Sequence, residues 1–207
     1  MIMMIVDSKA KVRRSLKIKE IDNNRIENDG RLIAEAQTDP AALARLYRRH
    51  YDAVFRYCVH RLFDRHLAED LTSEVFLKAV ENFYKFKGSE KQFRNWLYAI
   101  ATNTVNNYLR KAGRREKALK AVYQSSRDNA RNCEKTSPSL IALKKAMLGL
   151  KPKYQTIITL RFFENLKLNE IADIVDSGYG TVRSRMSRAL KLLAKRTVTE
   201  KEAMDYE

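Results

Sequence analysis

The 207-residue sequence is poor in cysteine, which argues against a disulfide-stabilised protein and against a zinc-binding protein. Its two cysteines, Cys58 and Cys133, cannot form a disulfide framework. Cys58 together with His60 and His66 matches no zinc-ligand spacing, and a second ligand pair is missing. We therefore expect a core thiol and surface imidazoles, with no metal and no other cofactor.

Long apolar runs are also missing. No stretch approaches the roughly 18 residues that a membrane-spanning helix needs. Residues 1–6 are too short for a signal-peptide core, and basic residues follow them instead of preceding them. These patterns predict a cytoplasmic protein without membrane insertion.

The sequence also lacks the motifs of common enzymes. It contains no glycine-rich phosphate loop, no paired-carboxylate metal site and no nucleophile beside a base. We therefore expect a protein that is not an enzyme.

What the chain has in excess is positive charge, +16 at neutral pH with a pI near 9.9, while 44% of its residues are apolar. This combination predicts folded cores and a polyanionic partner, with nucleic acid favoured over an anionic membrane surface.

Residues 170–193 are the most informative stretch. They predict a short helix, a turn at residues 176–178 and a second helix with one apolar face. That face repeats at helical spacing and comprises Val182, Met186, Ala189, Leu190 and Leu193. Six basic residues and no acidic residue lie between positions 177 and 197. A helix-turn-helix that enters a DNA major groove has this pattern, although an ordinary solvated basic face would also produce it.

The first half of the chain predicts a helical domain over residues 29–113, after a basic and disordered tail over residues 1–28. Asp39 and Pro40 form a cap followed by a proline, which predicts the start of a helix after a short one at 29–36. A third helix begins near Leu67. Its outer face carries Glu69, Asp70 and Glu74, which suit a basic protein partner or, equally, a helix N-terminus.

A loop and a fourth helix follow. Aromatic residues alternate with lysines in the loop at residues 83–91, which suits the capture of an unstacked base, although loop aromatics are more often packing anchors. The helix expected at residues 92–111 has an apolar stripe to which we assign Trp96, and Gly113 suits its C-terminal cap. Its polar side carries Asn103, Asn106, Asn107, Arg110 and Lys111.

The second half predicts a linker, a second helical domain and a tail. Residues 114–138 lack periodicity, and nine basic residues stand against three acids between positions 110 and 137. This linker is a flexible tether that would also attract nucleic acid. Helices are expected around residues 140–148, at 153–163 and in the helix-turn-helix, which together give a domain over 139–196. Residues 197–207 are expected to form an acidic, disordered tail. The predicted fold class is therefore all-α, with two small helical domains.

Two blocks of sequence in this order resemble one family. The first block comprises residues 68–79 and 93–110, and the second comprises residues 150–155, 160–161, 170–172, 180–185 and 188–189. The chain resembles the bacterial RNA polymerase sigma factors of the extracytoplasmic-function group of the sigma-70 family, over roughly residues 30–112 and 139–195.

The resemblance implies partners and a division of roles. Core RNA polymerase would bind Glu69, Asp70 and Glu74. The promoter −10 element would be opened by Phe86, Lys87, Ser89, Lys91, Asn103, Asn106, Asn107 and Arg110. The −35 element would be read as duplex by Thr181, Arg183, Ser184, Arg185, Ser187, Arg188 and Lys191. An anti-sigma factor is a further partner that the resemblance allows.

Two positions depart from the family pattern. The family usually caps the penultimate helix with serine or threonine, where this chain has Lys167, and it has glycine early in the turn, where this chain has Asp176. The main alternative function is a helix-turn-helix regulator that acts without entering polymerase. A nuclease is a more distant alternative, because the acids lack metal-ligand spacing.

Overall fold

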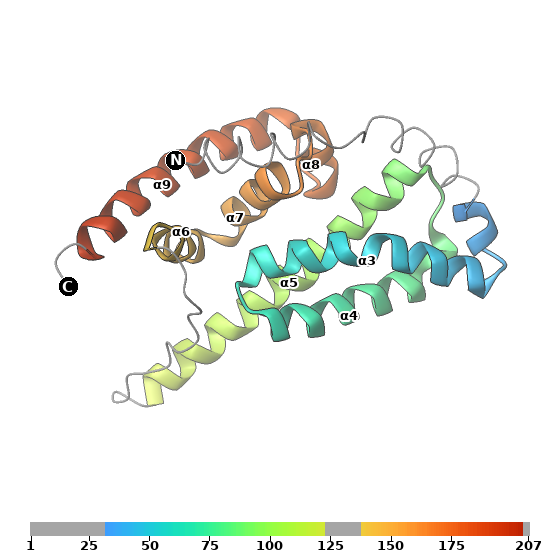
Figure 1. The fold of residues 1–207 in the computed structure, drawn as a ribbon, viewed down its shortest axis with the longest axis horizontal. Helices are drawn as coiled ribbons and strands as arrows, with labels where there is room; N and C mark the ends of the chain where they lie inside the picture. The colour runs from blue at the N-terminus through green and yellow to red at the C-terminus, as the bar shows by residue number, and fades with distance from the viewer. Residues whose placement is uncertain (1–31, 123–137, 205–207) are drawn as a thin grey trace.

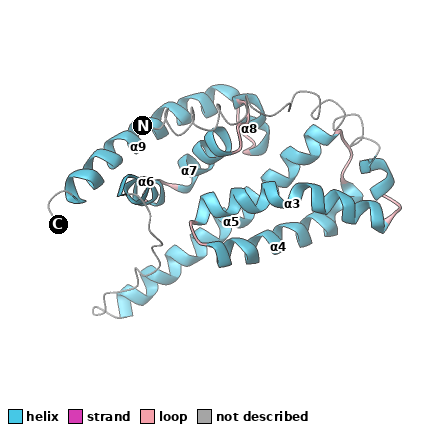
Figure 2. Cartoon of the chain, viewed as in Figure 1, coloured by secondary structure: helices cyan, strands magenta, loops and turns pink. Residues whose placement is uncertain are grey.

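The computed structural model describes residues 32–122 and 138–204, and within these ranges the chain is helical and contains no strand (Figure 2). The predicted all-α class is confirmed. The expected N-terminal tail, most of the expected linker and Cys133 lie outside the described residues.

The first unit begins with a helical turn at residues 32–36, followed by α3 (Pro40–Leu62), α4 (Arg65–Asn82), the short 3₁₀ helix η1 (Phe83–Lys85) and α5 (Glu90–Val122). The side chain of Asp39 accepts hydrogen bonds from the backbone N–H groups of Ala41 and Ala42, so the predicted start of α3 is confirmed. Phe63 ends α3 with a φ of 54°, and Asp64 then caps α4 by accepting from the N–H of Leu67. One short, capped corner at Phe63 and Asp64 thus joins α3 to α4, and the two helices pack against each other.

The core of this unit comes from the apolar faces that the helical periodicity predicts. Leu46, Val54 and Tyr57 of α3 are buried. All five inward positions expected for the third helix are also buried, namely Leu71, Val75, Phe76 and Ala79 of α4 and Phe83 of η1. The hydroxyl groups of Tyr57 and Thr102 are hydrogen-bonded at 2.8 Å, so the buried polar atoms where α3 crosses α5 satisfy each other.

The second unit consists of α6 (Pro138–Leu148), α7 (Pro152–Ile158), the π-helical turn η2 (Thr159–Phe163), α8 (Leu168–Ile174) and α9 (Tyr179–Met204). Val182, Met186, Ala189 and Leu193 of α9 are buried and Leu190 is half-buried, which confirms the apolar face expected for this helix. The long α9 lies across α6 and α7 (Figure 1). The predicted helix-turn-helix is formed by α8, the turn and the first half of α9.

Two expected ends of helices were wrong. Gly113 does not cap α5, because the helix continues to Val122. A glycine within a helix costs only about 1 kcal/mol relative to alanine, and the residues after it are good helix formers. The expected disordered tail from residue 197 is also wrong as far as Met204, where α9 ends.

The two departures from the family pattern are accommodated locally. Asp176 occupies the left-handed region with a φ of 45°, where glycine is usual, and the N–H of Ser177 bonds to the carbonyl of Ala172 at 3.0 Å. Lys167 provides no capping oxygen. Instead, the carboxylate of Glu170 accepts a hydrogen bond from the backbone N–H of Lys167 at 2.7 Å. The helix-turn-helix therefore retains its geometry with different residues.

The two units pack against each other. One continuous hydrophobic core includes Leu97 and Ala101 of the first unit together with Ile157, Leu160 and Ile171 of the second. Helix α5 contacts α7 and α8, and α3 contacts η2. Figure 1 shows the second unit seated above α3 and α5. The structure is therefore a closed arrangement of two helical units.

The cysteine and histidine expectations can be compared with their places in the fold. Cys58 is fully buried, and burial raises the pKa of its thiol to about 11, so the thiol belongs to the core as expected. His66 is exposed, whereas His60 is half-buried and its ring lies 4.2 Å from that of Phe163. The expectation of a surface imidazole is therefore correct for His66 and only partly correct for His60.

We predict that Asp176→Val lowers the free energy of unfolding by about 1–2 kcal/mol, because a β-branched residue is strained in the left-handed region. Asp173→Val is the matched control. Asp173 is exposed within α8, and aspartate and valine have similar helix propensities. Urea denaturation of both variants measures the difference. Equal losses would show that the backbone of residue 176 carries no special constraint.

His50 makes stability depend on pH. Burial, followed by the charges of Arg49 and Arg94, lowers the pKa of His50 to about 4. The imidazole is therefore neutral in the folded chain and gains a proton on unfolding below its ordinary pKa of about 6.5. We expect this group to remove about 2 kcal/mol of stability as the pH falls from 7.5 to 5.0.

Urea denaturation of the wild type and of His50→Gln at the two pH values measures this effect. The variant should lose the part of the pH dependence that His50 contributes. An unchanged pH dependence in His50→Gln would contradict the assignment.

Candidate nucleic-acid and polymerase interfaces

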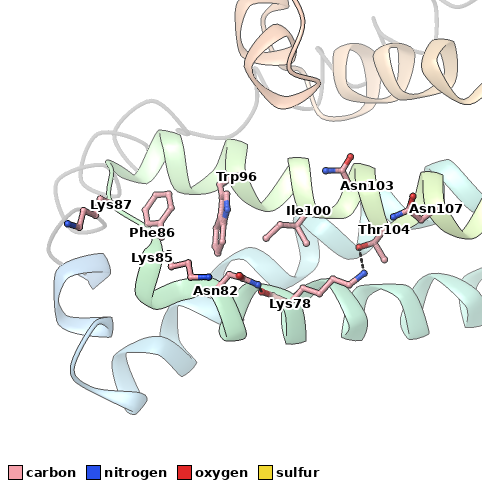
Figure 3. A pocket seen from close by; sticks show the side chains of 10 residues that line it. All are labelled: Lys78, Asn82, Lys85, Phe86, Lys87, Trp96, Ile100, Asn103, Thr104 and Asn107. Carbon is pink, nitrogen blue, oxygen red and sulfur yellow. Dashed lines mark hydrogen bonds between the residues drawn. The ribbon is translucent and has the colours of Figure 1, made fainter.

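A groove of about 540 Å³ runs between α4 and α5 beside the loop that joins them. Its lining combines aromatic rings, amides and lysines. It comprises Lys78, Asn82, Lys85, Phe86, Lys87, Trp96, Ile100, Asn103, Thr104 and Asn107 (Figure 3). Aromatic faces can stack on bases while cations contact phosphate, so the lining has the composition of a single-strand binding site.

The aromatic end of the groove is fixed by a cluster of rings. The ring of Phe86 lies 5.2 Å from that of Trp96 and 5.3 Å from that of Phe93. The side-chain amide of Gln37 donates to the carbonyl oxygens of Phe83 and Phe86, which fastens the loop to the start of the unit. The loop therefore presents Phe86 at a defined position.

The assignment of Trp96 to the core needs correction. Trp96 is half-buried, and its ring lies in the groove between α5 and α4 (Figure 3). Its neighbour Leu97 is the buried residue. Trp96 packs against the core from the margin of the apolar stripe, and the sequence does not show that this margin borders a groove.

The wall that α4 contributes to the groove was missed by sequence reasoning. Lys78 donates to the hydroxyl of Thr104 across the groove at 3.2 Å and also pairs with Glu74 on its own helix. Asn82 donates to the backbone carbonyl of Lys78 at 2.8 Å. Lysine and asparagine spaced four apart on the outside of a helix give no distinctive sequence signal. Only the packing of α4 along α5 places them opposite Asn103.

The −10 residues predicted from the sequence divide into two sets. Phe86, Lys87, Asn103 and Asn107 line the groove. The others, Ser89, Lys91, Asn106 and Arg110, lie outside its lining.

Each residue of the second set has another partner. Ser89 bonds to Gln92, Lys91 pairs with Glu170, and Arg110 donates to Asn107 at 2.9 Å. Asn106 does not share the face of Asn103 and Asn107, because it accepts a hydrogen bond from Arg61 at 2.5 Å. The expected common face is therefore corrected for Asn106.

The acidic residues of α4 lie on its surface, as predicted. Glu69 pairs with Arg65 and Glu74 with Lys78, each one helical turn apart, whereas Asp70 is exposed. The first turn of α4 contains no acid, so a helix N-terminus does not explain this cluster. The acids form one part of a larger exposed surface, which continues toward the C-terminal end of α4.

Apolar side chains on α4 and on η1, which follows it, extend the acidic surface. Leu77 and Val80 of α4 are 60% and 48% exposed, and Tyr84 of η1 is 68% exposed. Leu77 and Tyr84 follow Asp70 and Glu74 at helical spacing. Sequence reasoning missed them because exposed leucines cannot be distinguished from core leucines before the packing is known. We call Asp70, Glu74, Leu77, Val80 and Tyr84 the α4 outer face.

The basic face of α9 is open. The side chains predicted for duplex DNA are exposed at six positions, namely Thr181, Arg183, Ser184, Ser187, Arg188 and Lys191. Arg185 differs, because it is half-buried and donates to the hydroxyl of Ser177 at 3.2 Å, which braces the turn. A Cβ added at Gly178 or Gly180 would meet no atom within 4 Å, so the start of the helix is uncrowded.

The described residues contain no group of three or more histidine, cysteine, aspartate or glutamate side chains arranged to hold a metal ion. None of the described helices is both long enough and apolar enough to cross a bilayer. The features that stand out are thus a groove lined by aromatic rings, amides and lysines, a helix with an exposed basic face, and a mixed acidic and apolar face.

Comparisons with known proteins agree with these features. Residues 46–115 match the family profile for Sigma-70 region 2, and residues 140–193 match that for Sigma-70 region 4. The chain is 32% identical over 168 residues to the ECF RNA polymerase sigma factor BldN of Streptomyces coelicolor. This match covers 79% of the chain and 64% of BldN.

A second relative is covered almost completely. The ECF RNA polymerase sigma-E factor of Haemophilus influenzae is 30% identical over 182 residues, which cover 78% of the chain and 96% of that protein. The fold is similar to that of RpoE from Bartonella quintana, solved with the anti-sigma factor NepR. The TM-score is 0.59 at 24% identity, with 74% of this chain and 95% of RpoE covered.

The chain therefore belongs to the sigma-70 family of RNA polymerase sigma factors. Within that family it is a member of the extracytoplasmic-function group, to which both relatives belong by name. The matches to regions 2 and 4 indicate a sigma factor that binds polymerase. They do not favour the alternative of a regulator that acts apart from polymerase. Sigma factors as a family are not enzymes.

Proposed function

We propose that this chain binds core RNA polymerase through the α4 outer face, captures the opened −10 strand in the groove and reads the −35 duplex with α9. The observation that carries the proposal is the groove, which places the rings of Phe86 and Trp96 beside Asn103, Asn107 and three lysines. A regulator that binds only duplex DNA has no use for this arrangement. The proposed function requires both units to act on the same promoter.

Each surface suits its partner in physical terms. Amides in the groove can pair with base edges, and lysines at its rim can contact phosphate. On α9, arginines alternate with hydroxyl residues, which suits a helix lying in a major groove. The α4 outer face combines carboxylates with exposed Leu77 and Tyr84, which suits a protein partner that carries basic and apolar side chains.

The energy for strand opening comes from binding, without bond chemistry in this polypeptide. Stacking of one base returns about 1–3 kcal/mol, and unstacking that base costs a few kcal/mol. A single groove therefore only balances the cost of opening, and contacts within the polymerase complex supply the rest. The chain acts where polymerase acts, in the cytoplasm, and an anti-sigma factor is a suitable antagonist, as NepR is for RpoE.

The polymerase surface is tested by two matched leucines. Leu77 of the α4 outer face is 60% exposed, and Leu148 at the end of α6, outside the three proposed surfaces, is 45% exposed. We expect Leu77→Ala to weaken binding to core polymerase about 5- to 30-fold, as loss of an interface anchor does. Leu148→Ala should bind as the wild type does.

Fluorescence anisotropy of the labelled full chain with core polymerase measures both affinities, and run-off transcription measures the consequence. Promoter binding in a gel shift should be weak for the free chain and strong with core enzyme. Equal promoter affinity with and without core enzyme would overturn the proposed function.

The groove is tested at Trp96, the single tryptophan of the chain. We expect Trp96→Ala to reduce open-complex formation by about 5- to 150-fold, because base stacking on an aromatic ring is lost. Trp96→Phe keeps a ring and should retain most of the activity. Permanganate reactivity of −10 thymines measures opening, and protection of the −35 duplex provides a control that both variants should leave unchanged. A loss in Trp96→Phe equal to that in Trp96→Ala would argue against stacking.

A further inference from the structure

A large aromatic side chain is exposed at the first position of α9. Tyr179 begins this helix, and it is 52% exposed. It belongs to neither of the two hydrophobic cores. A single exposed apolar side chain is common on protein surfaces, so its position decides whether it has a role. Tyr179 was not among the residues that the sequence pattern marked for contact with DNA.

The turn before α9 is held by other residues. The N–H of Ser177 bonds to the carbonyl of Ala172 at 3.0 Å, and the hydroxyl of Ser177 accepts a hydrogen bond from Arg185 at 3.2 Å. Val182 is the first buried residue of α9 and anchors the helix to the core. The packing of the turn therefore does not account for an aromatic ring at position 179.

The surroundings of Tyr179 are open and continue into the basic face of α9. The neighbours of Tyr179 are Gly178 and Gly180, and a Cβ added at either glycine would meet no atom within 4 Å. Arg183 follows one helical turn later and is exposed. Residues four apart on a helix are surface neighbours. Tyr179 therefore lies at the leading end of the surface that we propose for duplex DNA.

Duplex DNA offers one apolar group that suits this position. The N-terminal residues of a recognition helix contact base edges in the major groove. The apolar group that base edges present there is the C5-methyl group of thymine, and aromatic side chains contact it. The two flanking glycines have no side chain that could reach a base in place of Tyr179. An aromatic ring between two glycines thus favours contact with a thymine methyl group.

We propose that Tyr179 is a specificity-determining residue of the −35 interface and that its ring contacts the methyl group of one thymine. The inference rests on the proposed function, because it concerns how α9 reads the −35 duplex. Tyr179 lies four residues before Arg183, which is roughly 6 Å along the helix, and successive base pairs are roughly 3.4 Å apart. The thymine is therefore expected within about two base pairs of the position that Arg183 contacts.

Removal of the methyl group from the DNA isolates this contact, because deoxyuridine pairs as thymidine does but lacks the C5-methyl group. Holoenzyme assembled from the full chain and core polymerase first selects promoters from a library randomised at both elements. The preferred promoter is then synthesised with deoxyuridine in place of each −35 thymine in turn, on either strand. Competition binding measures the affinity of holoenzyme for each of these duplexes.

Wild-type holoenzyme should lose affinity about fourfold at one deoxyuridine position, as the loss of one buried methyl group predicts. The same deoxyuridine should leave the affinity of Tyr179→Ala unchanged, because that variant has no ring to contact the methyl group. Tyr179→Phe keeps the ring and should respond as the wild type does. Promoter selection with Tyr179→Ala should lose the preference for thymine at that position alone.

Leu192→Ala is the matched control, because Leu192 is 40% exposed on the same helix and lies roughly 20 Å beyond Tyr179. It should respond to every deoxyuridine as the wild type does, and circular dichroism checks that each variant is folded. Equal deoxyuridine losses in the wild type and Tyr179→Ala would overturn the assignment of Tyr179, as would a uniform loss of affinity in Tyr179→Ala with unchanged base preferences, which marks a phosphate contact. Wild-type holoenzyme without any −35 preference would overturn the proposed function together with this assignment.

Discussion

Everything in this structure depends on the packing of helix α5. Its buried stripe, which includes Phe93, Leu97, Ala101 and Val105, packs against α3 and α4, and α5 also contacts α7 and α8. One helix therefore completes the core of the first unit, carries one wall of the groove and provides a seat for the second unit. Such support suits the role proposed for the groove, because a wall with several neighbours keeps its side chains in place.

Charge is distributed according to role. Cations that would meet DNA are left exposed on α9 and at the rim of the groove, where water solvates them until a phosphate arrives. Among the cations that face the other unit, Arg61 is buried and donates to Gln155, whereas Arg56, Arg94 and Lys91 reach Glu164 and Glu170 from partly or fully exposed positions. A chain with a net charge of +16 thus uses two of its few buried acids, Glu164 and Glu170, to hold its two units together. Without these acids, the positive charge that attracts the protein to DNA would make the two units repel each other.

Sequence reasoning predicted the features that local periodicity and capping control. The start of α3 at Asp39 and Pro40, the inward face of α4 and the apolar face of α9 were all correct. It failed where a local signal was overruled, as at Gly113, which lies inside α5. It also failed where tertiary packing decides, because the α4 side of the groove, the exposure of Trp96 and the bond from Arg61 to Asn106 depend on how α3, α4 and α5 meet. The contacts of Glu164 and Glu170 with the first unit join residues 66 to 108 positions apart, and no local pattern specifies such pairs.

The short connection between α5 and α6 affects how readily the two units separate. Helix α5 ends at Val122 and α6 begins at Pro138, so 15 residues connect the two units. A connection of this length spans at most roughly 50 Å, and it holds each unit near the other at an effective concentration in the millimolar range. A contact of only modest intrinsic affinity is therefore enough to keep the units together. A binding partner that keeps the units apart must outcompete this local concentration.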